Sequence, residues 1–199
     1  MMNWSRWNAA NLLTGFRLVA APILLTLAWF DWPITFLGLL AISFLSDVLD
    51  GYVARRLGQT SSFGARLDTW SDGVIYSTIA ISAWWLWPDV VREQAFYVGV
   101  VVASFTLPTL VGMSKFKTFT SYHTWSVKVA AACMGSSLYP LFLVGIVWPF
   151  HIATLVCVLA AIEEILITVL MPEPQSNIGS ILKVIQKRRS KQKRNRESL

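Results

Sequence analysis

Long apolar stretches, separated by short polar segments, make up most of the chain. They can be drawn at residues 12–30, 34–54, 68–87, 94–113, 125–148 and 150–170. Each is close to the ~20 residues that cross a bilayer as a helix with a rise of about 1.5 Å per residue. The breaks between them carry charged residues, prolines or both, which end apolar helices. This pattern predicts an all-α integral membrane protein with six transmembrane helices.

Composition supports this prediction. Apolar residues make up 55% of the 199 positions and charged residues only 14%, whereas soluble domains carry roughly 25% charged residues. The mean hydropathy is +0.54. The pattern divides the chain into an N-terminal interfacial segment (1–11), a six-helix membrane domain (12–171) and a basic tail (172–199). We expect the first helix to be retained, because no small-residue cleavage site precedes it.

The distribution of charge predicts the orientation. With these six helices, only Arg92 of the 17 Lys and Arg residues falls on one side of the membrane. Basic loops stay on the cytoplasmic side, so both termini are predicted to be cytoplasmic. Tryptophans gather at the opposite helix ends, as they do at membrane interfaces: Trp29, Trp32, Trp84, Trp85, Trp87 and Trp148.

The basic tail has an amphipathic pattern over residues 178–189. Apolar residues recur there at helical spacing, with lysines and arginines opposite. This pattern favours an interfacial helix on an anionic leaflet. Nucleic-acid binding is the competing interpretation of any basic run, and a solvated, unstructured tail is the simplest one. Attachment to a membrane protein makes membrane lipids, not nucleic acid, the expected partner.

Charged residues concentrate between the second and third apolar stretches. On a helix Asp47, Asp50, Gly51 and Ala54 share one face, since they lie at i, i+3, i+4 and i+7. Asp68 and Asp72 share a face of the following helix. The polar connection between these helices contains turn-forming residues. We therefore expect two antiparallel neighbouring helices whose carboxylates converge at their cytoplasmic ends.

Four converging carboxylates repel one another unless cations compensate them. Oxygen ligands suit Mg²⁺, Mn²⁺ or Ca²⁺ better than Zn²⁺, and two such ions can clamp the attacking and leaving oxygens of a phosphoryl displacement. Arg55 and Arg66 would then face phosphate, not the aspartates. A salt-bridged helix cap is the alternative. An EF-hand would need an alternating ligand pattern that the chain lacks.

The same residues carry a resemblance to a known family. The signature is D-x2-D-G-x2-A-R-x8-G-x3-D-x3-D, and its positions are Asp47, Asp50, Gly51, Ala54, Arg55, Gly64, Asp68 and Asp72. The chain thereby resembles the CDP-alcohol phosphatidyltransferases, and "NLLTGFRLVAAP" at 11–22 is similar to that family's first-helix segment. The resemblance implies two Mg²⁺ or Mn²⁺ ions per site, a CDP-linked lipid donor, CMP as leaving group and a homodimer.

The resemblance also implies residue roles. Metal binding is assigned to Asp47, Asp50, Asp68 and Asp72, and Asp72 is also the expected general base. CDP binding is assigned to Gly51, Ala54, Arg55 and Gly64. Phosphate or acceptor binding is expected of Asn11, Thr14, Arg17, Arg66 and Lys128. Because the loop charges put these residues on the cytoplasmic side, we expect an active site that faces the cytoplasm in a cell inner membrane or an organelle membrane.

The expected reaction moves a phosphatidyl group from CDP-diacylglycerol to a polar alcohol. Lys128 lies near the start of the fifth helix, where a cation needs an anionic partner, so glycerol 3-phosphate is the preferred acceptor. Inositol phosphate, serine, phosphatidylglycerol, or a CDP-alcohol donor with diacylglycerol would fit the same signature. A non-catalytic metal-binding membrane protein and an aspartate-rich prenyltransferase are more distant alternatives.

The remaining polar residues and the two cysteines suggest structural roles. Glu163 and Glu164 fall inside the sixth stretch, and we expect one of them to face the helix bundle or to pair with a basic residue. His123 is interpreted as a hydrogen-bonding loop residue. Cys133 and Cys157 are interpreted as small packing residues without a disulfide.

Overall fold

The computed structural model describes residues 9–56, 62–117 and 124–171, and all regular structure within these ranges is helical. The helices are α1 (Ala9–Trp29), α2 (Pro33–Arg56), α3 (Ser62–Leu86), α4 (Pro88–Glu93), α5 (Ala95–Phe116), α6 (Trp125–Val144) and α7 (Trp148–Leu170). The six long helices fall on the six apolar stretches. The tail and His123 lie outside the described residues.

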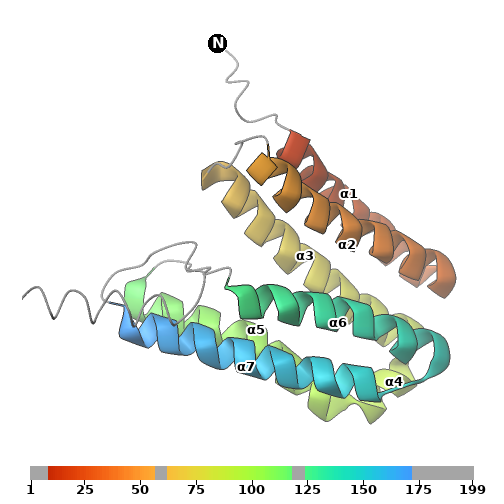
Figure 1. The fold of residues 1–199 in the computed structure, drawn as a ribbon. Helices are drawn as coiled ribbons and strands as arrows, with labels where there is room; N and C mark the ends of the chain where they lie inside the picture. Colours follow the sequence, from red (N-terminus) through yellow and green to blue (C-terminus); the bar gives the residue numbers. More distant parts are fainter. Residues whose placement is uncertain (1–8, 57–61, 118–123, 172–199) are drawn as a thin grey trace, which may run out of the picture. The chain divides into compact units, whose positions relative to one another are not determined.

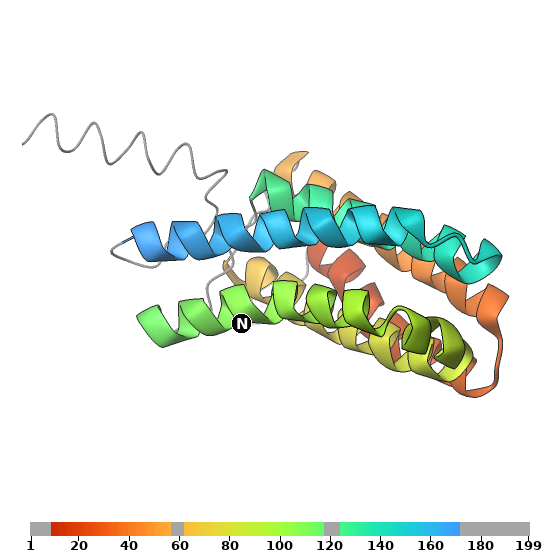
Figure 2. The ribbon, with the colours of Figure 1, turned by 90° about the horizontal axis from the view of Figure 1, so that it is seen from below.

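Packing divides the chain into two units, Met1–Arg92 and Glu93–Leu199. In the first unit α1 packs against both α2 and α3 (Figure 1). In the second unit α7 packs against both α5 and α6, and Figures 1 and 2 show α6 and α7 as an antiparallel pair joined by a tight turn. Each unit is therefore a three-helix assembly built around one shared helix.

Small side chains allow close packing in the first unit. Ala20, Ala21, Leu24 and Ala28 form one buried face of α1 at helical spacing. Phe36, Leu37 and Leu40 of α2 and Ile75 of α3 are also buried. The alanines remove side-chain bulk where α1 meets its neighbours, as small residues do between membrane helices.

Turn chemistry sets the helix ends. Asp31 adopts a left-handed backbone conformation with φ 56° between α1 and α2, and Pro33 opens α2. The Thr124 hydroxyl caps α6 by accepting a hydrogen bond from the Val127 N–H at 3.3 Å. Gly145, with φ 73°, ends α6 and donates its N–H to the Leu141 carbonyl at 3.2 Å. The turn at Asp31 confirms the break expected after the first apolar stretch, whereas the turn at Gly145 lies earlier than the break expected after the fifth.

Some of the helix boundaries expected from the sequence were wrong. Helix α3 begins at Ser62 and not at residue 68, because the polar residues before Asp68 continue the helix instead of forming a turn. Helix α6 ends at Val144 and not at 148, since Gly145 supplies a left-handed cap within the apolar run. The short α4 begins at Pro88 and lies in the break expected between the third and fourth apolar stretches.

Four of the described helices are long and apolar enough to cross a membrane. They comprise Leu12–Trp29, Ala95–Phe116, Trp125–Val144 and Trp148–Leu170. Helix α2 has a shorter apolar segment, Pro33–Leu49, because charged residues occupy its last turns. Exposed Ile152, Leu155, Leu159 and Ile162 recur along one face of α7, as expected of a lipid-facing surface. These features indicate a membrane protein.

Candidate active site

Arg17 links the three long helices of the first unit. Its Nη1 atom lies 2.6 Å from Oδ1 of Asp47 in α2 and 2.6 Å from Oδ1 of Asp72 in α3. The Arg17 side chain is 3% exposed, whereas the side chains of Asp47 and Asp72 are 43% and 31% exposed. The guanidinium therefore lies beneath two carboxylates that remain accessible from outside.

The helical register of α1 explains the burial of Arg17. Thr14 lies three residues before Arg17 and the alanine-rich face begins three residues after it, so all of them fall on the face that packs against α2 and α3. Thr14 is also buried. An arginine on this face needs anionic partners inside the helix assembly, and the two aspartates supply them.

The two aspartates lie at the edge of the buried faces of their own helices. Ser46, which precedes Asp47, is buried, and so is Ser71, which precedes Asp72. Adjacent residues on a helix point about 100° apart. Each carboxylate can therefore contact Arg17 on its inner side while it remains partly exposed on its outer side.

Charge-assisted contacts hold this cluster together. One guanidinium faces two carboxylates, and charge-assisted hydrogen bonds of this length are the strong kind. Burying a guanidinium without such partners would be strongly unfavourable. Both carboxylates remain partly exposed, so a further cation can approach them from outside.

The spacing of the two carboxylates suits a divalent cation. Because both Oδ1 atoms contact the same nitrogen, their separation is at most twice the 2.6 Å contact distance. Oxygen ligands of Mg²⁺ lie at about 2.1 Å from the ion, so neighbouring ligands are about 3 Å apart. Small movements of the carboxylates would therefore let them share an ion, and the donor set fits a hard cation.

The other expected metal ligands fall on the same two helices. Asp50 lies one turn after Asp47 in α2, and Asp68 lies one turn before Asp72 in α3, but both side chains lie outside the described part. Among the side chains that the structure describes, no group of three or more metal-ligating residues occurs. The structure thus brings together Asp47 and Asp72, half of the expected set.

Several expected binding residues have helical backbones but side chains outside the described part. These are Asn11 in α1, Gly51, Ala54 and Arg55 in α2, and Gly64 and Arg66 in α3. Lys128 belongs to the second unit, where it is exposed and its Nζ lies 5.5 Å from the centre of the Trp125 ring. Their roles in substrate binding stay predictions.

Sequence reasoning missed the direct contact of Arg17 with the aspartates. Arg17 was expected to bind phosphate or the acceptor. The carboxylates were expected to converge between the second and third helices, without a contribution from the first. The signal was present, since an arginine inside an apolar helix requires an anion and Asp47 and Asp72 lie on the neighbouring helices. The carboxylates do converge, and they do so on α1.

Two polar contacts organise the second unit. The Lys115 Nζ donates to the carbonyls of Thr168, Val169 and Met171 at 2.9, 2.9 and 2.8 Å, and so caps the C-terminal end of α7. The Ser126 hydroxyl of α6 donates to the carboxylate of Glu163 in α7. Glu163 therefore faces a neighbouring helix, as expected of one of the two glutamates.

Comparisons with known proteins agree with the signature. The model of the family described as "CDP-alcohol phosphatidyltransferase" matches residues 7–170. No solved structure matches the chain.

Three curated relatives illustrate the similarity. CDP-diacylglycerol–glycerol-3-phosphate 3-phosphatidyltransferases from Salmonella choleraesuis and Cereibacter sphaeroides are 31% and 42% identical over 41% and 36% of this chain. A CMP-forming cardiolipin synthase from Rattus norvegicus is 38% identical over 38% of this chain. The matched segments span 50%, 33% and 26% of these relatives' own lengths.

Proposed function

The chain belongs to the CDP-alcohol phosphatidyltransferase family, and we propose that it transfers a phosphatidyl group from CDP-diacylglycerol to a polar alcohol with release of CMP. The observation that carries this proposal is the cluster of Arg17, Asp47 and Asp72, in which two helices of the signature present accessible carboxylates at one point. Such a cluster suits chemistry on a diphosphate at a membrane surface.

The metal site in this proposal consists of Asp47, Asp50, Asp68 and Asp72. Members of the family generally depend on a divalent metal, and the all-oxygen ligand set favours two Mg²⁺ or Mn²⁺ ions. Bound ions would hold the donor's diphosphate and neutralise the charge that develops on departing CMP. The contacts of Arg17 with Asp47 and Asp72 support the proposal, because they hold two of the carboxylates close together.

Asp72 is the proposed general base. It takes the proton from the acceptor hydroxyl as the oxygen attacks the β-phosphorus and the bond to CMP breaks. Its 31% exposure leaves room for the acceptor to approach, while the contact with Arg17 fixes its orientation. Asp72 can act only as the ionised carboxylate.

The donor contacts follow from side-chain size and charge. Gly51, Ala54 and Gly64 leave space for the cytidine, since larger side chains would occupy it. Arg55 presents a planar guanidinium to a donor phosphate, and Arg66 is a second candidate for this role.

Glycerol 3-phosphate is the proposed acceptor. Two of the relatives described above carry this substrate in their names. Lys128 is the proposed partner of the acceptor's phosphate, because it is exposed near the start of α6, and Asn11, Thr14 and Arg17 are the candidate contacts on α1. The similarity to a cardiolipin synthase supports phosphatidylglycerol as the second candidate acceptor.

The acceptor is tested by steady-state kinetics on Lys128→Ala with saturating CDP-diacylglycerol. Loss of a charge-assisted contact should raise the KM for glycerol 3-phosphate about tenfold or more, and Lys128→Arg should retain most of the affinity. An unchanged KM in Lys128→Ala would remove Lys128 from the acceptor site. Greater turnover with phosphatidylglycerol than with glycerol 3-phosphate would favour the second candidate.

The proposed topology extends the four apolar helices to six spans. Helices α2 and α3 would complete the set, with the aspartates near the cytoplasmic surface and both termini in the cytoplasm. Residues 12–171 would form one catalytic domain that assembles as a homodimer, with the segment 1–11 and the basic tail 172–199 on the same side. A lipid donor could then keep its acyl chains in the bilayer while its cytidine diphosphate reaches the aspartates.

A further inference from the structure

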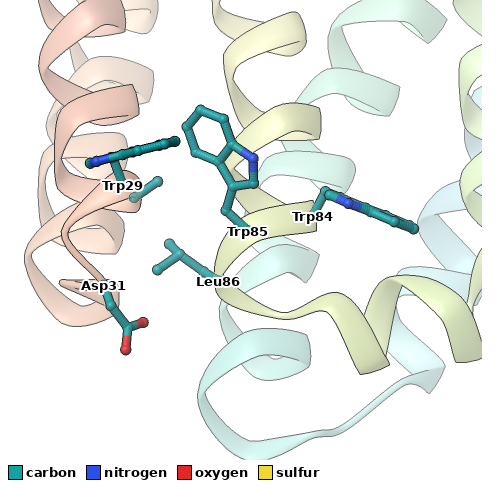
Figure 3. A pocket seen from close by; sticks show the side chains of 6 residues that line it. Trp29, Asp31, Trp84, Trp85 and Leu86 are labelled. Carbon is teal, nitrogen blue, oxygen red and sulfur yellow. The ribbon is translucent and has the colours of Figure 1, made fainter.

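An open pocket lies at the other end of α1 and α3 from the aspartates. Its volume is about 540 Å³. Its lining comprises Ala28, Trp29, Asp31, Trp84, Trp85 and Leu86 (Figure 3). The proposed phosphatidyl transfer uses none of these residues.

Two contacts fix the place of this pocket in the first unit. Arg17 of α1 pairs with Asp72 of α3, and Trp29 of α1 meets Trp85 of α3 with ring centres 5.4 Å apart. The contact that lies later in α1 also lies later in α3, and the separation in sequence is nearly the same in both pairs. The two helices therefore run in parallel. Twelve residues separate Arg17 from Trp29 along α1, which corresponds to about 18 Å. The pocket is therefore a separate place, not an extension of the candidate active site.

The lining suits a cation with an apolar attachment. Trp29 and Trp85 meet edge to face at 78°, and Figure 3 shows Asp31 and Leu86 below this pair while Trp84 points away from it. Indole faces attract cations. Asp31 adds an opposite charge to the lining, with its carboxylate below the rings and directed away from them in Figure 3. Asp31 carries the pocket's charge.

A contact between a cation and an indole ring already occurs near the pocket. The Arg92 guanidinium lies 5.6 Å from the centre of the Trp84 ring. Arg92 also pairs with Asp89 at 3.2 Å on the exposed surface. An indole at this end of the unit thus meets a cation in the structure, although Arg92 does not line the pocket.

Exposure of the rings favours a lipid ligand over a soluble one. Trp29, Trp84 and Trp85 are 71%, 51% and 43% exposed at the ends of apolar helices, where tryptophans mark the membrane–water boundary. A phospholipid there would bring a headgroup to the level of Asp31 and acyl chains to the apolar helix surface. A headgroup with an ammonium complements the carboxylate, whereas an anionic headgroup would be repelled by it.

We propose that this pocket binds the ammonium headgroup of a zwitterionic phospholipid, with Asp31 as the counter-ion and the Trp29 and Trp85 rings as its aromatic wall. Phosphatidylethanolamine is the simplest such lipid. Its binding would hold α1 and α3 together at the end away from the aspartates.

The test is native mass spectrometry of the purified protein in detergent, with phosphatidylethanolamine and phosphatidylglycerol of identical acyl chains added in equal amounts. Wild-type protein should retain phosphatidylethanolamine preferentially. Asp31→Asn should lower this preference about two- to fivefold, the range for an exposed ion pair. Asparagine tolerates the left-handed backbone of this position, so the turn is preserved.

Matched variants separate the pocket from general effects. Asp89→Asn removes an exposed carboxylate outside the pocket and should leave the preference unchanged. Trp85→Leu should lower the preference about two- to fivefold through loss of an indole face, whereas Trp148→Leu, at an exposed indole of the second unit, should not. Equal retention of the two lipids by wild-type protein, or an equal loss in Asp31→Asn and Asp89→Asn, would overturn the proposal.

Discussion

Replacement of Arg17 by glutamine should destabilise the protein in a way that a divalent cation can reverse. The change removes the guanidinium whose Nη1 contacts Asp47 and Asp72 at 2.6 Å each, and it leaves two carboxylates close together beside a buried amide. Breaking a fully buried ion pair costs about 3–5 kcal/mol. Because the carboxylates are 43% and 31% exposed and water can screen them, we expect a smaller loss of about 2–4 kcal/mol.

The measurement is thermal unfolding of purified protein in detergent micelles, with and without Mn²⁺. A loss of this size lowers the Tm by roughly 4–16 °C in a chain of this length. Millimolar Mn²⁺ should restore a large part of the loss, since the ion replaces the missing positive charge between the carboxylates. Wild-type protein should gain less from Mn²⁺, because Arg17 already neutralises part of the carboxylates' charge.

Arg92→Gln is the matched control. It removes an arginine from the exposed pair with Asp89, whose members are 64% and 86% exposed. Such surface pairs contribute about 0–1 kcal/mol. If Arg17→Gln destabilised the protein no more than Arg92→Gln did, or if Mn²⁺ did not distinguish the two variants, the structural role given to Arg17 would be refuted.

Three further predictions concern catalysis, helix capping and topology. Asp72→Asn should lower turnover by at least about 10²-fold in an assay of CMP release, because asparagine cannot accept a proton. Near-normal turnover in this variant would exclude Asp72 as the base. Asp47→Asn should instead raise the metal concentration needed for half-maximal activity. Lys115→Met should lower the free energy of unfolding by about 1–3 kcal/mol, since the C-terminal carbonyls of α7 lose a charged donor; an unchanged Tm would show that this cap is dispensable. Cysteines placed at Ser61 and Asp89 should react with impermeant reagents from opposite sides of the membrane, and labelling of both from one side would refute the six-span topology.

Helix positions could be predicted from the sequence because apolar stretches of about 20 residues have few alternatives in a bilayer. Helix boundaries were less predictable where the conformation of single residues, and not the apolar pattern, decides where a helix ends or begins. Gly145 ends α6 inside an apolar run, because its left-handed conformation closes the helix, and Ser62 starts α3 within a segment that looked like a turn.

The candidate site was also predictable in part. Local helical spacing indicated where the carboxylates lie, but not which other helix packs against them. Helical spacing placed Asp47 and Asp72 on defined faces, and their convergence is confirmed by their shared contact with Arg17. Spacing within one helix says nothing about which third helix lies against those faces. The role of Arg17 therefore required the packing of α1 against both α2 and α3.

Release of CMP from CDP-diacylglycerol by the purified protein is the most direct measurement of the proposed activity. The assay contains CDP-diacylglycerol in mixed micelles, glycerol 3-phosphate and either Mn²⁺ or Mg²⁺, with Asp72→Asn protein as the control. We expect CMP and a phosphatidyl product in equal amounts, and their formation should depend on both the acceptor and the metal. Formation should be at least about 10²-fold slower with the variant. No CMP from wild-type protein with glycerol 3-phosphate, serine, inositol phosphate or phosphatidylglycerol, or equal CMP from Asp72→Asn, would contradict this proposal.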